Sequence, residues 1–74
     1  RELDLSDNRI SDLTPLAYML KLEKLDLSNN EVGAITALLN LTQLKQLDLR
    51  GNDLSDEQIE TLEKTLTDCE ILHD

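Results

Sequence analysis

The sequence predicts an α/β solenoid, in which short parallel strands alternate with return segments. The prediction rests on one string that recurs at a fixed distance. The string L-x-x-L-D-L-S-x-N-x-V occupies residues 22–32, and it returns 22 residues later as L-x-x-L-D-L-R-x-N-x-L over residues 44–54. Its second half also stands 22 residues earlier, over residues 3–10. Three copies at one period indicate a repeat protein, whose coils stack on each other.

Each repeat begins with a strand that presents alternate side chains to opposite faces. In the first strand, over residues 2–5, Leu3 and Leu5 face one way and the polar residues face the other. Parallel strands in register place equivalent residues about 4.8 Å apart. Three outward ladders follow: Glu2, Lys24 and Gln46; Asp4, Asp26, Asp48 and Glu70; and Ser6, Ser28, Arg50 and Leu72.

The return segment of the first repeat spans residues 11–21, where apolar residues recur at steps of roughly three. Pro15 and the short span favour 3₁₀ turns over a full α-helix. Tyr18 lies in this segment and has no aromatic counterpart, because Asn40 takes its place one period later. Tyr18 is either a surface contact or a filler of the outer face.

The pattern changes after residue 54. Ser55 is a predicted helix N-cap, and Gln58 completes a capping box three residues later. Neither glycine nor proline interrupts residues 55–72. We therefore expect an α-helix of about three turns in this part of the chain.

The repeat period, continued through this change, places a degenerate fourth strand at residues 69–71. In that register Cys69 stacks on Leu47 as a small buried hydrophobe, not as a reactive thiol. We divide the chain into residues 1–54, with one partial and two complete strand units, and residues 55–74, with a capping helix and the fourth strand.

One asparagine follows each strand, at the corner of its coil. Backbone groups in this corner cannot pair in the sheet, and leaving a buried group unbonded costs roughly 1–3 kcal/mol. A side-chain amide offers two donors and an acceptor, so the asparagines are expected to satisfy the corner from inside. This structural ladder consists of Asn8, Asn30 and Asn52.

The charge balance limits the classes of molecule that the chain can bind. The chain has 7 Lys and Arg against 16 Asp and Glu, for a net charge of -9. Such a field repels nucleic acid and anionic membranes, so neither is expected as a partner, and a basic protein surface fits best. The alternative is that the acidity only keeps a small apolar stack soluble.

The ladder of Asp4, Asp26, Asp48 and Glu70 has three interpretations. It keeps the strand face hydrated, it is a binding strip for a basic partner, or it is a site for a hard cation. Stacked carboxylates are expected to raise one another's pKa. Carboxylates held on strands seldom converge on one ion, which disfavours a metal site. A flat, open face lacks the desolvated cleft that a general acid needs, so no catalytic role is expected.

No other residue group indicates a cofactor or catalysis. His73, the only histidine, lies one residue from the end, and Gly33 and Gly51 form no phosphate loop. The single cysteine permits no internal disulfide, which favours a reducing compartment. No signal-peptide or membrane-spanning pattern is present. We expect a cytoplasmic rather than secreted protein, with no enzymatic activity, metal or cofactor.

The string L-x-x-L-D-L-S-x-N-x-[IVL] resembles the leucine-rich repeat family. The 22-residue period, with D-L-T-P-L at residues 12–16, is similar to the short-repeat branch, which includes bacterial internalins and the phosphatase-1 regulatory subunit with tandem short repeats. Residues 52–72 are similar to the C-terminal closing segment of many such proteins. The resemblance implies a curved, right-handed solenoid, with the parallel sheet on the concave face and 3₁₀ and α-helical segments on the convex face.

The resemblance also implies protein–protein binding through the concave side chains and no catalytic activity. Lys24 and Arg50 are the positive exceptions on that face, and we expect them to form directed ion pairs with a partner. The positions that carry the binding role are Glu2, Asp4, Ser6, Lys24, Asp26, Ser28, Gln46, Asp48, Arg50 and Glu70.

Three functions follow. The first is an adaptor that grips a partner by its concave face, with salt-sensitive association. The second is a purely structural C-terminal cap of a longer array, since the chain opens inside a repeat. The third is a targeting segment of a multidomain enzyme or surface adhesin. The apolar end formed by Leu3, Leu5 and Ile10 also favours end-to-end self-association.

Overall fold

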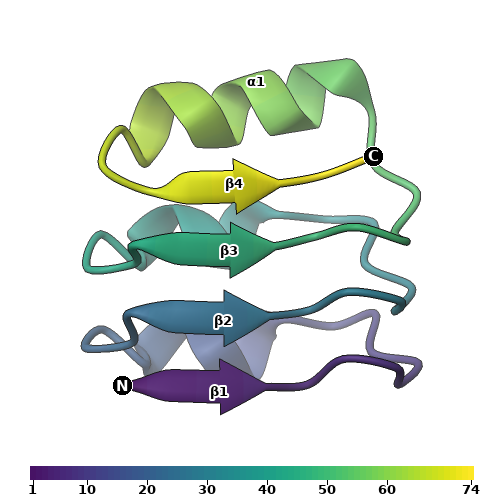
Figure 1. Cartoon of the computed structure of the whole chain (residues 1–74), viewed down its shortest axis with the longest axis horizontal. Helices are drawn as coiled ribbons and strands as arrows, with labels where there is room; N and C mark the ends of the chain where they lie inside the picture. Colours follow the sequence, from purple (N-terminus) through teal and green to yellow (C-terminus); the bar gives the residue numbers. More distant parts are fainter.

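The computed structural model describes all residues 1–74 and shows a stack of coils (Figure 1). The first coil (residues 1–21), the second coil (residues 22–43) and the third coil (residues 44–69) each begin with a strand, and a last strand closes the sheet. The strands are β1 (Glu2–Asp4), β2 (Lys24–Asp26), β3 (Gln46–Asp48) and β4 (Glu70–Leu72), and the return segments are the 3₁₀ helices η1 (Thr14–Tyr18) and η2 (Thr36–Asn40) and the α-helix α1 (Asp56–Thr65).

The strands form one parallel sheet in the order β1-β2-β3-β4. Glu2 pairs with Lys24, and Lys24 pairs with Gln46, so the 22-residue period sets the register of the first three strands. The predicted α/β solenoid with a short parallel sheet and 3₁₀ return segments is confirmed. Its right-handedness stays a prediction.

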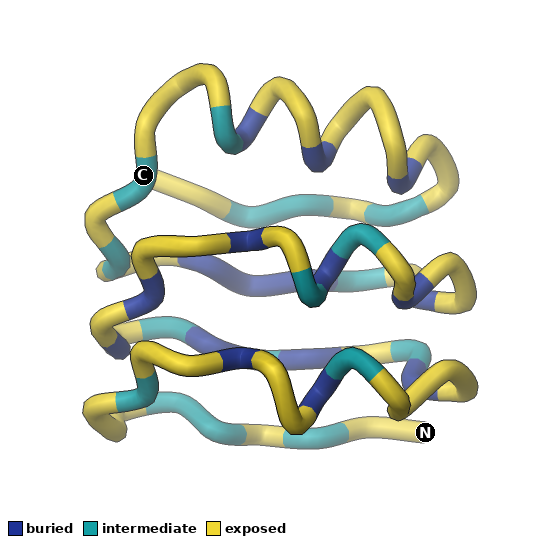
Figure 2. Tube along the Cα trace, turned by 180° about the vertical axis from the view of Figure 1, so that it is seen from behind, coloured by how far each residue is buried: buried dark blue, intermediate teal, exposed yellow.

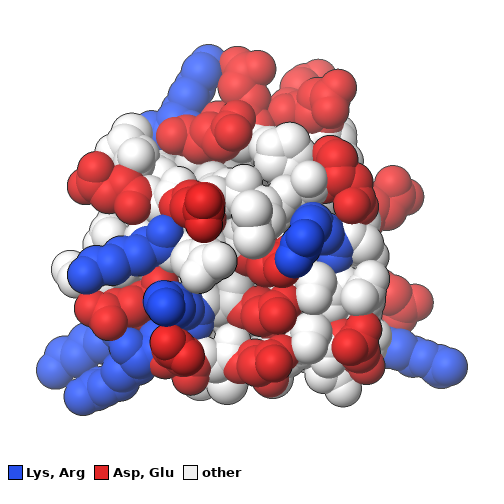
Figure 3. All heavy atoms as spheres, in the orientation of Figure 1, with Lys and Arg blue, Asp and Glu red and all other residues white.

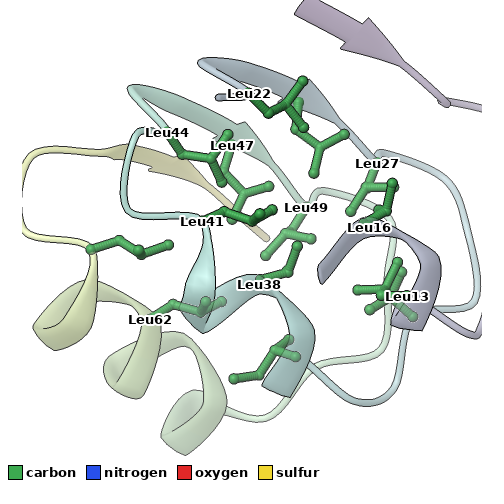
Figure 4. Packing of buried hydrophobic residues seen from close by; sticks show 14 of the residues in the cluster. Leu13, Leu16, Leu22, Leu27, Leu38, Leu41, Leu44, Leu47, Leu49 and Leu62 are labelled. Atoms are coloured by element: carbon green, nitrogen blue, oxygen red, sulfur yellow. The ribbon is translucent and has the colours of Figure 1, made fainter. Parts of the chain in front are cut away.

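Side chains from the sheet and from the return segments meet in one core (Figure 4). The core holds 15 buried residues, all of them Leu, Ile or Val. Seen from behind, the outer turns of the return segments are exposed, and buried positions interrupt them at intervals (Figure 2). Aliphatic side chains of similar size can fill each layer in the same way, which suits coils that stack at one spacing.

The 3₁₀ segments bury one leucine each, Leu16 in η1 and Leu38 in η2. Pro15 lies in the first turn of η1, where its missing N–H leaves no helix bond unmade. Other apolar residues of the first return segment behave differently. Met19 and Leu20 follow η1 and are exposed to solvent.

Asn30 joins the second coil to the first. Its Nδ2 donates to the carbonyl oxygens of Leu5, Leu27 and Ser28 at 2.9, 3.0 and 3.2 Å, and its Oδ1 accepts from the Ile10 N–H at 3.1 Å. The side chain is buried, so water cannot reach these backbone groups, and Asn30 provides their hydrogen-bond partner instead.

Asn52 makes the corresponding contacts one coil later, except the one equivalent to the Ser28 carbonyl. Its Nδ2 donates to the carbonyl oxygens of Leu27 and Leu49 at 2.8 and 3.1 Å, and its Oδ1 accepts from the Val32 N–H at 2.9 Å. Asn8 is exposed and bonds only within its own coil. Thus Asn30 and Asn52 tie neighbouring coils together, whereas Asn8 only closes its own corner.

The fourth strand does not have the register that the period predicts. Gln46 pairs with Glu70 and Asp48 pairs with Leu72, so the step from residue 46 to residue 70 is 24 residues. The return segment here is an α-helix, which rises about 1.5 Å per residue against about 2.0 Å in a 3₁₀ helix. More residues are therefore needed to cross the same coil.

Two expectations are wrong as a result. Glu70 does not continue the aspartate ladder but extends the ladder of Glu2, Lys24 and Gln46, and Leu72 lies beside Asp48 instead. Cys69 does not stack on a strand leucine. It precedes β4 and is half-buried against the edge of the core.

Helix α1 begins with the predicted capping box. The Gln58 N–H donates to Ser55 Oγ at 3.2 Å, and the Ser55 N–H donates to Gln58 Oε1 at 2.9 Å. Gln58 Nε2 also donates to the Gly33 carbonyl at 2.7 Å, which ties the helix to the second coil. Ile59 and Leu62 are buried, and α1 lies beside β4 at the end of the stack (Figure 1).

Candidate functional site

The outward side chains of the sheet and of the strand ends form one surface, which we call the strand face. The parallel register brings most of the predicted site residues together there, around a shallow hollow of about 410 Å³. The hollow is lined by Glu2, Leu3, Asp4, Lys24, Leu25, Asp26, Gln46 and Asp48. Acidic side chains occupy the middle of this face, with basic side chains to either side (Figure 3).

The predicted residues of the strand face differ in how accessible they are. Glu2, Asp4, Lys24, Arg50 and Glu70 are exposed; Ser6, Asp26, Ser28 and Gln46 are half-buried; and Asp48 is buried. Glu70 lies outside the hollow, since its register places it beside Gln46 at the sheet's last strand.

In the first two coils, the strand aspartate closes a turn with the serine two residues later. Asp4 Oδ1 accepts from the Ser6 N–H at 3.0 Å and from its hydroxyl at 2.6 Å. Asp26 Oδ1 accepts from Ser28 in the same way, at 3.0 and 2.7 Å. The hydroxyl groups of both serines therefore donate within the chain. The second carboxylate oxygen of each aspartate has no hydrogen-bond partner in the chain.

These bonds reverse one electrostatic expectation. The Ser6 hydroxyl, followed by its backbone N–H, lowers the pKa of Asp4 below the ordinary value of the group. Bonds to the charged form favour ionisation, and here they outweigh the opposing effect of burial on the pKa of Asp4. The predicted upward shift along the ladder is therefore wrong for Asp4.

Asp48 and Arg50 form a closed pair in the third coil. Asp48 Oδ1 accepts from Arg50 Nε at 3.0 Å and from its backbone N–H at 3.1 Å, and Asp48 Oδ2 accepts from Nη2 at 2.7 Å. The Arg50 side chain lowers the pKa of Asp48 although burial opposes the shift. The upward shift is wrong for Asp48 too.

This pair changes the roles predicted for both residues. Asp48 is only 8% exposed, so a partner can reach little of its carboxylate. Arg50 is already held in the bidentate geometry that carboxylates prefer, and a new ion pair with a partner has to replace it. The third coil therefore adds little free charge to the strand face.

Lys24 and Glu2 form a looser ion pair, with Nζ and Oε1 3.4 Å apart and both side chains more than half exposed. Exposed pairs of this kind are weak and exchange partners easily. Asp4 and Asp26 form no ion pair at all. The free negative charge in the hollow is thus concentrated on these two aspartates, and Glu70 adds an unpaired carboxylate outside the hollow.

The strand face presents charged and polar groups that can bind a partner. No cluster of three or more His, Cys, Asp or Glu side chains is placed to hold a metal ion. His73 is exposed, with its ring Nδ1 2.9 Å from the Asp74 carbonyl oxygen. Burial raises the pKa of the Cys69 thiol, which keeps it protonated at neutral pH. None of the helices combines the length and apolar character needed to cross a membrane.

Two features of the structure were open to detection in the sequence. The D-x-S spacing of Asp4 with Ser6 and of Asp26 with Ser28 is the spacing of a side-chain-closed turn, which explains an aspartate at the strand end. The solvent exposure of Leu20 could have been predicted from its counterpart, because the period aligns Leu20 with a polar residue, Thr42.

The repeat seen in the structure agrees with a known family pattern. A sequence model of the family described as Leucine rich repeat matches residues 1–54. The matched range contains β1, β2, β3 and both 3₁₀ segments, and α1 and β4 follow it. No individual curated protein matches the chain.

Proposed function

Since the chain belongs to the leucine-rich repeat family, whose members generally bind other proteins, we propose that it is a non-catalytic interaction module that grips a partner through the strand face. One observation carries the proposal. Asp4 and Asp26 stand side by side in the hollow, in register, and neither forms an ion pair within the chain.

The chemistry of this hollow favours a basic partner. Neighbouring strands in register lie about 4.8 Å apart, a backbone spacing from which two adjacent carboxylates can both reach one ammonium or guanidinium group. The lowered pKa of Asp4 keeps that group ionised through the neutral range. The net charge of -9 also attracts a basic surface from a distance and raises the association rate.

A pair of matched variants tests the strand face. The strand variant carries Asp4→Asn, Asp26→Asn and Glu70→Gln. The helix variant carries Glu57→Gln, Glu60→Gln and Glu63→Gln on the exposed side of α1. Each variant loses three carboxylates, so their net charges are equal, and asparagine retains an oxygen that can accept the Ser6 and Ser28 bonds.

Both variants and the unchanged chain serve as baits in native lysate, after circular dichroism has shown the same fold. The proposal predicts a protein that the unchanged chain and the helix variant retain and the strand variant loses, with weaker retention at high salt. Equal loss on both variants would indicate attraction by overall charge. Equal retention on all three baits would place the binding surface elsewhere.

A second role is favoured by α1, namely closure of the repeat stack. The helix packs against η2 and buries Ile59 and Leu62 in the core, and Gln58 bonds it to Gly33 of the second coil. If this were the whole function, none of the three baits would retain a protein.

A further inference from the structure

A second surface differs from the rest of the molecule in both charge and polarity. It lies where the first return segment turns back toward the sheet, just after η1. Tyr18 is 85% exposed and Leu20 is 55% exposed there, in a chain whose other large apolar residues are mostly in the core. Met19, between them, is also exposed.

Comparison with the second coil shows which of these positions are exposed in both coils and which are exposed only in the first. One period later, Tyr18 and Leu20 correspond to Asn40 and Thr42, which are exposed although coils lie on both sides of them. These two positions therefore face solvent inside the stack, and the first coil has apolar residues in place of polar ones. Met19 is different, because its counterpart Leu41 is buried. The exposure of Met19 therefore reflects its place in the first coil.

The same corner carries free positive charge. Lys21 corresponds to the neutral Gln43 of the second coil, and neither its ammonium nor the guanidinium of Arg1 forms an ion pair. Arg1, Tyr18, Leu20 and Lys21 line one hollow of about 500 Å³. Basic side chains gather at this corner, at the lower left of Figure 3, beside the amino-terminal end of the strands.

We propose that this corner, formed by Arg1, Tyr18, Leu20 and Lys21, is a second docking site, which binds an acidic segment of a partner protein through an apolar side chain flanked by carboxylates. An apolar residue in the hollow covers Tyr18 and Leu20, which removes exposed apolar surface from water. The flanking carboxylates pair with Lys21 and Arg1, whose charges have no partner in the chain.

The charge preference of this corner is opposite to that of the strand face. The chain as a whole, at -9, repels an acidic segment, so the corner is the place where such a segment is attracted. The two sites therefore select different chemistry, and the failure of one does not entail the failure of the other.

The test uses the second coil as its own control. The corner variant carries Tyr18→Asn, Leu20→Thr and Lys21→Gln, which copies into the first coil the residues that the second coil has at the same solvent-facing positions. The fold is therefore retained, and circular dichroism with a thermal unfolding curve checks it. The probe is a random peptide library displayed on phage, selected on the unchanged chain with counter-selection on the corner variant.

The proposal predicts enriched peptides in which a Leu, Ile, Phe or Trp adjoins Asp or Glu. A synthetic peptide from that set is expected to bind the corner variant at least roughly tenfold more weakly by fluorescence anisotropy, the loss typical of removing a contact at the centre of an interface. Replacing its Asp and Glu by Asn and Gln is expected to weaken binding, and the strand variant is expected to bind it at least as well as the unchanged chain.

Three results would overturn the proposal. One is that no peptide is enriched on the unchanged chain over the corner variant. Another is that the enriched peptides lack carboxylates. The third is that the amide resonances of residues 18–21 shift with protein concentration in the absence of peptide, because a second copy of the chain would then be the occupant of the corner.

Discussion

The first and second coils share the L-D-L-S-x-N string of the repeat but have very different surroundings. Their local bonds agree: Asp4 accepts from Ser6 as Asp26 accepts from Ser28, and both coils return through a five-residue 3₁₀ segment. Their burial does not agree. Leu25 is 2% exposed, whereas Leu3, at the same strand position, is only half-buried.

The difference shows that the repeat sequence sets conformation and that the neighbouring coils set burial. A coil in the middle of the stack covers both of its flat sides, while the first coil leaves one side open. The stability of a repeat protein is roughly the sum of unit and interface contributions, so equivalent residues in the two coils should contribute unequally. Four predictions sharpen this comparison.

The largest effect is expected in the strand leucines. Leu25→Ala should lower the free energy of unfolding by about 3 kcal/mol, because it leaves a cavity in the core, whereas Leu3→Ala should cost about 1 kcal/mol. Urea unfolding followed by circular dichroism measures both. Equal losses at the two positions would show that burial in the stack does not set the contribution.

The corner asparagines should show the next largest difference. Asn30→Ala leaves the Ile10 N–H and the Leu5 and Leu27 carbonyl oxygens without this partner and should cost about 2 kcal/mol. Asn8→Ala removes bonds that water can replace, and its cost should be well below that. The comparison fails if thermal unfolding finds the two variants equally destabilised.

The turn before the asparagine gives a third comparison. Asp7 and Asn29 adopt positive φ there, at 58° and 57°, and Gly51 holds the position in the third coil at 78°. A Cβ added at Gly51 would clash with Asn29 Oδ1. Gly51→Ala should therefore cost about 1–2 kcal/mol, since both the backbone and the contact are strained.

Gly33→Ala is the matched control, because a Cβ there meets nothing within 4 Å and the backbone is not in the left-handed region. It should leave the urea midpoint unchanged or raise it slightly, by restricting the unfolded chain. A midpoint that drops as far as that of Gly51→Ala would remove the steric explanation.

The smallest effect concerns acid. The pKa of Asp48 is lowered in the folded state, chiefly by the Arg50 side chain. The pair therefore stabilises the fold fully above the ordinary pKa of an aspartate, about 3.9, and this contribution is lost as the pH falls through the lowered value. Arg50→Gln should flatten the acid limb of stability against pH. Ser6→Ala should flatten it less, because Asp4 is exposed. Urea unfolding in a series of acidic buffers measures both, and an unchanged limb in Arg50→Gln would contradict the account.

The sequence predicted those parts of the fold in which one local structure repeats. The ladder of Glu2, Lys24 and Gln46 followed from the period, and the capping box of Ser55 and Gln58 from its spacing. The position of Glu70 did not, because the period was extended across a return segment of a different type. A period measures chain length per coil, and an α-helix uses more residues per ångström than a 3₁₀ helix.

The candidate site was predicted in composition but not in electrostatics. Counting carboxylates along a ladder leaves out their hydrogen bonds, and these decide which charges are free. Asp48 forms a bidentate ion pair with Arg50, while Asp26 forms no ion pair. The exposure of Leu20 was not predicted, because apolar periodicity alone cannot distinguish a core position from an exposed one.

If the strand face contacts the partner, a photoreactive residue placed on that face should form a crosslink with it. A photoreactive residue replaces Gln46, in the hollow, or Glu60, on the exposed side of α1. The account predicts a crosslinked protein from position 46 that high salt diminishes, and none from position 60. A crosslink from position 60 with none from position 46 would contradict it.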